Sequence, residues 1–115
     1  MYRIVVYKRY YDKFIQKLSE TERRKLLDVL FVFRAAKPIP PQCIKYLRNE
    51  IYELRVTSMG NALRLFFFYD GAKIVVLLNG FRKKSQKTPK REIEQAIKLK
   101  EAYYAEKEKG RTVVL

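Results

Sequence analysis

The sequence predicts a small α+β domain, in which two N-terminal helices pack on a mainly antiparallel four-stranded sheet and a C-terminal helix closes one side. Three observations predict this class. Apolar residues recur with a helical period near both ends of the chain, the period changes to two between residues 50 and 81, and 48% of the 115 residues are apolar. A chain of this size buries one core, so we expect residues 1–115 to form a single domain.

The N-terminal third predicts a strand followed by two helices. Residues 3–7 are β-branched and aromatic, which favours a strand. Ser19 and Glu22 have the spacing of a capping box, in which each side chain satisfies a free backbone N–H at a helix start. Pro38 should end the second helix near residue 36. The apolar positions of the two helices are Tyr11, Phe14, Ile15 and Leu18, then Leu26, Leu27, Leu30, Phe31 and Phe33.

Residues 50–81 predict a three-stranded antiparallel meander with turns at residues 58–61 and at Asp70-Gly71. An even first loop places Arg55 opposite Arg64, and a two-residue second turn places Leu65 opposite Val76. One face is then apolar and should pack on the two helices, with the opposite face left for function. The apolar face would carry Tyr52, Leu54, Val56, Leu63, Leu65, Phe67, Ile74, Val76 and Leu78.

The C-terminal region predicts a third helix. Thr88 is the expected cap, and Pro89 suits the first helical position, where its missing N–H costs nothing. A narrow apolar stripe continues the helix through Ile93, Ala96, Ile97 and Tyr104. Residues 111–115 are apolar but few, and they predict a frayed tail or a weak strand.

The charge balance limits the partner and the chemistry. The chain has 26 Lys and Arg against 12 Asp and Glu, a formal net charge of +14, which favours nucleic acid first and an anionic membrane second. With no histidine and only Cys43, the usual zinc cages and Ser-His-Asp or Cys-His catalysis are excluded. We expect no metal and no other cofactor. An early charge at the N-terminus and no long apolar run indicate a soluble, cytoplasmic protein without a membrane partner.

The candidate site is a group of cations at one end of the meander. Placing Arg55 opposite Arg64 breaks the rule against like charges across a ladder, and such exceptions often mark function. Guanidinium groups can hold two phosphate oxygens at once, and a crowded lysine can have a lowered pKa. This combination predicts RNA cleavage by the neighbouring 2′-hydroxyl, with Lys83 or Lys84 moving a proton. The further donors after the third strand are Arg82, Lys83, Lys84, Gln86 and Lys87.

Three segments carry a resemblance to a known family: residues 51–55, 63–67 and 77–89, followed by Glu92, Ile93 and Ala96. They resemble RelE-like toxins of the RelE/ParE superfamily, with most similarity to the HigB-type, phage-derived branch. The resemblance implies a RelE-like fold and a toxin that cuts translated mRNA on the ribosome and is inhibited by a cognate antitoxin. By position, Arg55, Arg64 and Lys84 look like the family's basic site residues. Strand alternation instead puts Lys83 on the arginine face, so both lysines remain candidates.

Several alternatives stay open. Glu53 is either an ion-pair partner that holds Arg55 or a general base, and the first is preferred. Phe66 could stack on an RNA base, whereas Phe67 belongs to the core. On the same scaffold, the chain could instead be a non-enzymatic ParE-like poison of DNA gyrase. A third interpretation is a plain nucleic-acid-binding module.

Overall fold

The computed structural model describes residues 1–84 and 87–113, with side chains as far as Lys109. Three helices, one short 3-10 turn and five strands occur in this part of the chain. In chain order they are β1 (Arg3–Val6), α1 (Tyr10–Gln16), α2 (Glu20–Arg34), η1 (Pro41–Cys43), β2 (Ile44–Arg48), β3 (Ile51–Ser58), β4 (Asn61–Asp70), β5 (Ile74–Lys83) and α3 (Lys90–Val113).

The strands form one mixed sheet in the order β1-β5-β4-β3-β2, with β1 parallel to β5 and the other pairs antiparallel. The expected α+β class is confirmed, but the expected four strands are wrong. The missed strand, β2, is a short edge strand with charged residues at Lys45 and Arg48, as edge strands often have. Its turn to β3 uses Asn49 and Glu50, both with positive φ, where hairpins usually have glycine.

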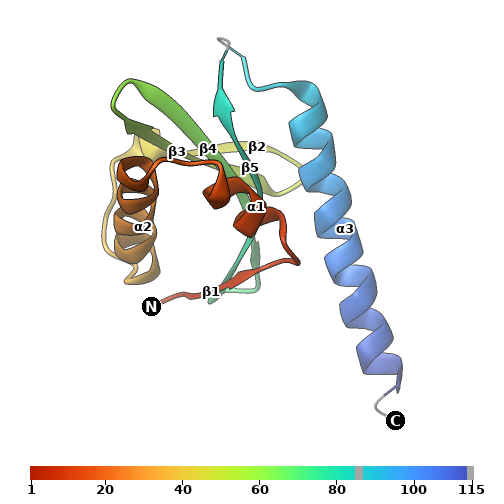
Figure 1. The fold of residues 1–115 in the computed structure, drawn as a ribbon. Helices are drawn as coiled ribbons and strands as arrows, with labels where there is room; N and C mark the ends of the chain where they lie inside the picture. The colour runs from red at the N-terminus through yellow and green to blue at the C-terminus, as the bar shows by residue number, and fades with distance from the viewer. Residues whose placement is uncertain (85–86, 114–115) are drawn as a thin grey trace.

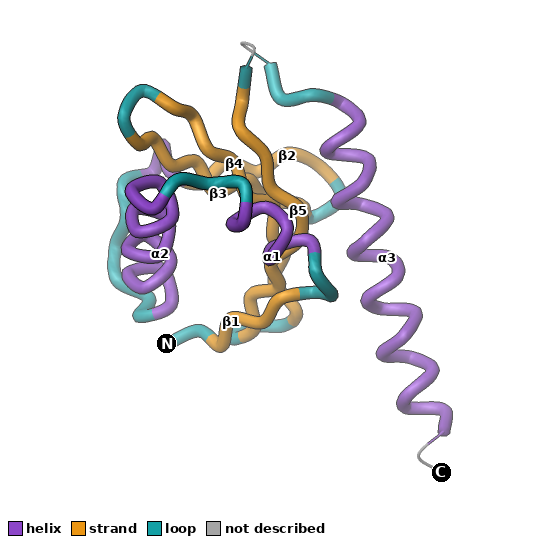
Figure 2. Tube along the Cα trace, viewed as in Figure 1, coloured by secondary structure: helices purple, strands orange, loops and turns teal. Residues whose placement is uncertain are grey.

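Helices cover both faces of the sheet (Figure 1). On one face α1 and α2 pack against Leu54, Val56, Leu63 and other apolar side chains, and on the other α3 packs against Phe66, Phe68, Val76 and Leu78. We expected one uncovered face, so this part of the helix arrangement is corrected. Figure 2 shows α3 running along the sheet and extending past it.

The strand registers explain why both faces are apolar. The pairing of Arg55 with Arg64 is confirmed, but that of Leu65 with Val76 is wrong, since Leu65 pairs with Gly80. The turn between Asp70 and Ile74 has three residues instead of two, which reverses the inward and outward positions of β5. Val75 and Leu77 therefore face α1 and α2, and Ile74, Val76 and Leu78 face α3.

A register shift in the β4–β5 ladder then returns the last residues of β5 to the faces of the sheet that the sequence predicted for them. The register shifts between Leu65 and Phe67, opposite residues 77–80. Asn79 points to the α3 side, where its amide donates to the Glu92 backbone oxygen at 3.2 Å, whereas a Cβ on Gly80 would meet Phe14 of α1. The bulge thus decides which way residues 81–84 point.

The helix ends agree with the sequence at α2 and differ at α3. Ser19 and Glu22 form the expected capping box, with Glu22 N donating to Ser19 Oγ at 3.1 Å. At α3, however, the Thr88 hydroxyl donates to Glu53 Oε2 at 2.7 Å. The expected tail or strand at 111–115 is helical through Val113, and residues 114 and 115 lie outside the described residues.

Polar contacts hold the second half of α3. Tyr103 donates to Asp70 Oδ2 at 2.6 Å, Lys107 contacts the same oxygen at 2.7 Å, and Tyr7 donates to Glu106 at 2.8 Å. These contacts fix α3 to the β4–β5 turn and to the end of β1. Among the described residues, no helix combines the length and the apolar character that crossing a bilayer requires.

Candidate nucleic-acid interface

Two arginines from neighbouring strands meet on the α3 side of the sheet. Arg55 of β3 lies directly opposite Arg64 of β4, and both share this face with the buried side chains under α3. Arg64 is only 7% exposed and donates from Nη1 to the Leu63 backbone oxygen at 2.9 Å. Burial lowers the pKa of Arg64, as does Arg55, whereas Glu53 raises it. The sheet thus holds a guanidinium group in a nearly buried position next to a second one.

Glu53 is the carboxylate that makes this arrangement possible. Its side chain is 1% exposed, and its Oε1 lies 3.6 Å from Arg55 Nε and 3.7 Å from Arg64 Nε. The other oxygen accepts the Thr88 hydrogen bond, which links the site to the start of α3. A buried carboxylate with these partners compensates part of the arginine repulsion, which fits an ion-pair role.

Lys83 is the lysine that shares the arginine face. It pairs with Ala62 on β4, two residue pairs beyond the pair of Arg64 and Phe81, and it therefore lies on the same side of the sheet as Arg64. Burial lowers the pKa of Lys83, and the nearby Arg64 lowers it further, while Glu53 raises it. Lys83 is therefore placed where an ammonium group gives up its proton more readily than usual.

Lys84 points elsewhere. It is exposed and lines a small hollow with Phe14, Lys17 and Arg82, at the free edge of β5. The difference between the two lysines follows from the bulge, which sets the alternation of β5 as far as Lys83. Of the two open candidates, the structure brings only Lys83 next to Arg64.

Arg82 lies on the α1 and α2 side, away from Arg64. It contacts both oxygens of the buried Glu22, with Nη2–Oε1 at 2.5 Å and Nε–Oε2 at 3.0 Å, and it donates to the Lys17 backbone oxygen. The hydrogen bonds from Arg82, together with the capping bond at Ser19, lower the pKa of Glu22 to about 2. Arg82 thus joins β5 to the helices.

The other residues predicted to contact RNA are Phe66, Lys87 and Gln86, and they differ in burial and in whether the structure describes them. Phe66 is fully buried and packs on Phe81 at a ring distance of 5.7 Å, so the expected base stacking is corrected: α3 covers this ring. Lys87 is exposed beside Thr88. Gln86 lies outside the described residues.

Two site residues were not found by sequence reasoning. The sequence predicted that Thr88 caps a helix. Its observed role, a hydrogen bond to the Glu53 carboxylate, depends on a tertiary contact that the local sequence does not contain. Lys45 pairs with Glu53 across the β2–β3 ladder and contributes to the lowered pKa of Lys83. It was missed because β2 was missed.

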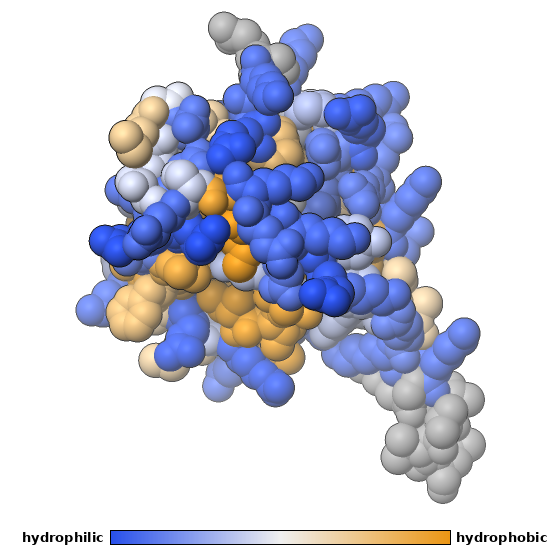
Figure 3. Space-filling view, viewed as in Figure 1, coloured by the Kyte–Doolittle hydropathy of each residue, from blue (hydrophilic) through white to orange (hydrophobic). Residues whose placement is uncertain are grey.

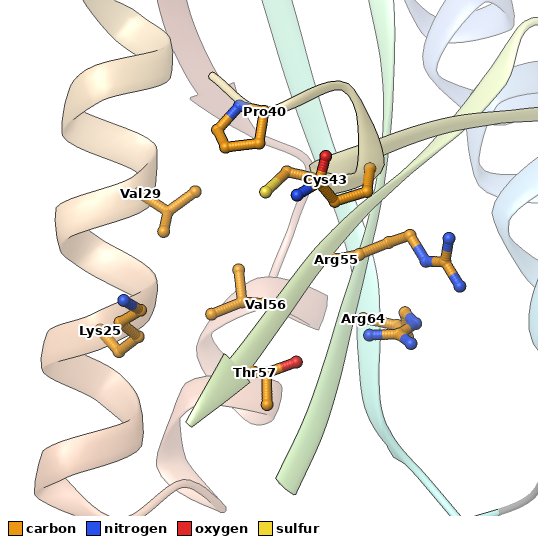
Figure 4. A pocket seen from close by; sticks show the side chains of 9 residues that line it. Lys25, Val29, Pro40, Cys43, Arg55, Val56, Thr57 and Arg64 are labelled. Atoms are coloured by element: carbon orange, nitrogen blue, oxygen red, sulfur yellow. The ribbon is translucent and has the colours of Figure 1, made fainter. Parts of the chain in front are cut away.

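A notch adjoins the arginines at the edge of the sheet. It is open to solvent and has a volume of about 590 Å³ between α2, the segment around η1, and the edge of β3. Figure 4 shows Val56 of β3 facing Val29 of α2, with Pro40 and Cys43 beside them, and both guanidinium groups on the other side of the strand. In Figure 3, hydrophilic residues cover most of the face that carries α1 and α2, and hydrophobic ones are visible between these helices.

Comparison with known protein families gives a match over most of the chain. Residues 13–101, from α1 to the middle of α3, match the family described as phage derived protein Gp49-like (DUF891). The chain belongs to this family. The Gp49-like family is phage-derived, is associated with toxin–antitoxin systems and is related to RelE-like toxins. The matched part includes Arg55, Arg64, Lys83 and Glu53. A comparison with curated proteins finds no match.

Proposed function

We propose that this Gp49-like chain is the toxin of a type II toxin–antitoxin pair and that it cleaves mRNA on the ribosome, as the HigB-type branch of the RelE-like toxins does. The observation that carries the proposal is the convergence of Arg55, Arg64 and Lys83 around the buried Glu53. Three cations against one carboxylate leave an excess of positive charge that suits a phosphodiester.

The buried guanidinium supplies a preformed phosphate contact. Within the described part of the chain, Arg64 Nε is buried and has no hydrogen-bond partner, since Glu53 Oε1 lies 3.7 Å away. A buried donor without a partner is costly, and the nearby Glu53 carboxylate offsets part of that cost, so a phosphate would contact the exposed part of the guanidinium instead of Nε. Because the position of Arg64 is fixed by the sheet and by its bond to Leu63, little reorganisation is needed when charge develops on the phosphate.

The reaction assigned to the site is attack by the neighbouring 2′-hydroxyl. The 2′-oxygen forms a bond to phosphorus and the bond from phosphorus to the 5′-oxygen breaks, which leaves a 2′,3′-cyclic phosphate and a 5′-hydroxyl. The proton of the 2′-hydroxyl passes to a water molecule of the solvent, and another proton joins the 5′-oxygen. Arg55 and Arg64 stabilise the charge on the phosphorane, and Lys83, with its lowered pKa, delivers the proton to the 5′-oxygen.

The partners in this proposal follow from the charge and the family. A net charge of +14 favours docking on ribosomal RNA in the cytoplasm, and the message is the substrate. The cognate antitoxin is the inhibitory partner that the toxin–antitoxin association suggests. An antitoxin that covers the arginine face would block access to Arg55 and Arg64.

The test is cleavage of a message in a translating extract, read by primer extension and by analysis of the new RNA ends. We expect the chain to produce 2′,3′-cyclic phosphate ends, and Arg64→Ala to slow cleavage by about 10²–10³-fold, as loss of one preorganised donor does. Arg24→Ala is the matched control, because Arg24 is an exposed arginine on α2 that pairs with Glu20.

Two results would contradict the proposal. One is an intact message under conditions in which the protein arrests growth, above all if DNA supercoiling by gyrase is inhibited instead. The other is unchanged cleavage by a folded Arg64→Ala variant, with folding checked by circular dichroism.

A further inference from the structure

The notch beside the arginines has a polar side and an apolar side. Arg55 and Arg64 line it from the other side of β3, the face proposed for the phosphate, whereas Val29, Pro40, Val56 and Cys43 line it on the α2 side. A ligand that fills the notch and reaches the arginines therefore needs an anionic group joined to an apolar body. A nucleotide has this combination, because its base presents flat apolar faces next to the charged phosphate.

The size of the notch fits the same ligand. A volume of about 590 Å³ lies within the range of roughly 300–1,000 Å³ that is usual for small-molecule sites. Such a space is large enough for a single nucleotide. The notch thus suits a base that has been unstacked from its neighbours, as single-stranded RNA allows.

The rim of the notch supplies groups that can distinguish bases. Gln42, Thr57 and Lys25 line it, with amide, hydroxyl and ammonium groups that donate or accept hydrogen bonds. The backbone contributes as well. β2 pairs with β3 only as far as Leu54, so in the described chain the outer edge of β3 from Arg55 to Ser58 has no strand beside it.

We propose that the notch between α2, η1 and the edge of β3 is a nucleobase subsite, which holds the base next to the phosphate that Arg55 and Arg64 grip. The inference rests on the proposed function for its substrate and goes beyond it by assigning the residues that select the base. The apolar walls contact the faces of the base, and Gln42 reads its hydrogen-bonding edge.

The first experiment measures binding without the ribosome. The four nucleoside 3′-monophosphates are compared with ribose 5-phosphate and inorganic phosphate by calorimetry, and a short single-stranded RNA separates a free nucleotide from one within a chain. Cys43, the one cysteine of the sequence, lines the notch, so its rate of alkylation reports occupancy directly. We expect at least one nucleotide to bind about tenfold more tightly than ribose 5-phosphate and to slow alkylation of Cys43.

The second experiment tests the base-reading residue. Gln42 is exposed, so Gln42→Ala should fold normally, and Gln16→Ala, at another exposed glutamine, is the matched control. We expect Gln42→Ala to remove most of the preference among the four nucleotides while leaving inorganic phosphate binding unchanged. Gln16→Ala should change neither.

The outcomes separate this inference from the proposed function. Equal binding of nucleotides and ribose 5-phosphate, or unchanged alkylation of Cys43 at saturating nucleotide, would overturn the subsite even if the protein cleaves mRNA. Protection of Cys43 by the antitoxin but by no nucleotide would also overturn it, by assigning the notch to a protein partner. Base-selective binding with no cleavage would support the subsite and contradict the nuclease.

Discussion

Lys83 and Lys84 show how much of the site depends on the direction of a single side chain. They carry the same charge and are neighbours in sequence, yet Lys83 lies beside Arg64 and Lys84 lines a hollow with Phe14 and Lys17. Chemistry that depends on a crowded ammonium group should therefore use one lysine and ignore the other.

We predict that Lys83→Ala slows message cleavage by about 10²–10⁴-fold, the usual contribution of a proton-transfer group. Lys84→Ala, with the same loss of charge, should stay within a few-fold of the native rate. The measurement is single-turnover cleavage on ribosome complexes. The reverse order of the two variants would place the proton donor at Lys84.

The pH dependence gives a second readout of the same residue. The pKa of Lys83 is lowered from 10.5, so its protonated form is lost at a lower pH than that of an ordinary lysine. If Lys83 is the acid, cleavage should decline as the pH rises through this lowered value. Lys83→Arg keeps its charge there, so its residual activity should lack the decline.

At the scale of elements, α1 is placed on the sheet by the absence of a side chain at Gly80. A Cβ at this position would lie 2.5 Å from Phe14 Cδ2, much closer than carbon atoms approach. We predict that Gly80→Ala lowers the free energy of unfolding by about 1–3 kcal/mol, as overpacking does. Urea denaturation measures the loss. In a Phe14→Leu background the same change should cost less, and an equal cost would rule out this contact as the cause.

The buried Glu22 joins α2, β4 and β5, since it accepts from Arg82 and, at 3.0 Å, from the amide of Asn61. Its folded pKa is about 2 against an ordinary value of 4.5. A carboxyl group with a lowered folded pKa stabilises the fold above its unfolded pKa. That stabilisation is lost as the pH falls through the folded value.

We therefore predict that part of the stability disappears between about pH 4.5 and pH 2 through Glu22. Glu22→Gln should be less stable at neutral pH by about 1–3 kcal/mol and should lose less on acidification through this range. Glu20→Gln is the control, because Glu20 is exposed and its pair with Arg24 lies on the surface. Urea denaturation at a series of pH values gives both comparisons, and parallel curves for Glu22→Gln and the native chain would refute the prediction.

The elements also show what sequence could and could not predict. The β3–β4 register was predictable because Arg55 and Arg64 are equidistant from a clear turn. The β4–β5 register was not, since Asp70-Gly71 has the sequence of a two-residue turn and the chain uses three. The bulge that follows depends on contacts of Asn79 with α3, which no local pattern contains.

At the scale of the whole molecule, the α+β class was predictable from the periodicity of the apolar residues, and the structure confirms it. The net charge of +14 predicts a polyanionic partner, which stays a prediction. The side of the sheet that α3 covers was not predictable, because the predicted stripe of Ile93, Ala96, Ile97 and Tyr104 could have packed on either face. This is why Phe66 was expected in the site and lies in the core.

The same net charge makes RNA binding sensitive to salt. The site predicts which arginine contributes to this salt dependence and which does not. For single strands, log K falls against log salt by about 0.7 for each phosphate neutralised. A guanidinium that grips one phosphate should account for one such increment. We predict that Arg64→Ala lowers the slope by about 0.7, whereas Arg24→Ala leaves it almost unchanged.

Fluorescence anisotropy of a short labelled RNA over a range of salt concentrations measures both slopes. The comparison separates a built phosphate site from general attraction to a basic surface, because both variants remove one positive charge from the chain. Equal reductions in slope would mean that the charge acts diffusely and that the arginine face grips no particular phosphate. A reduction confined to Arg64→Ala would locate one phosphate contact at the guanidinium that the sheet holds nearly buried beside Glu53.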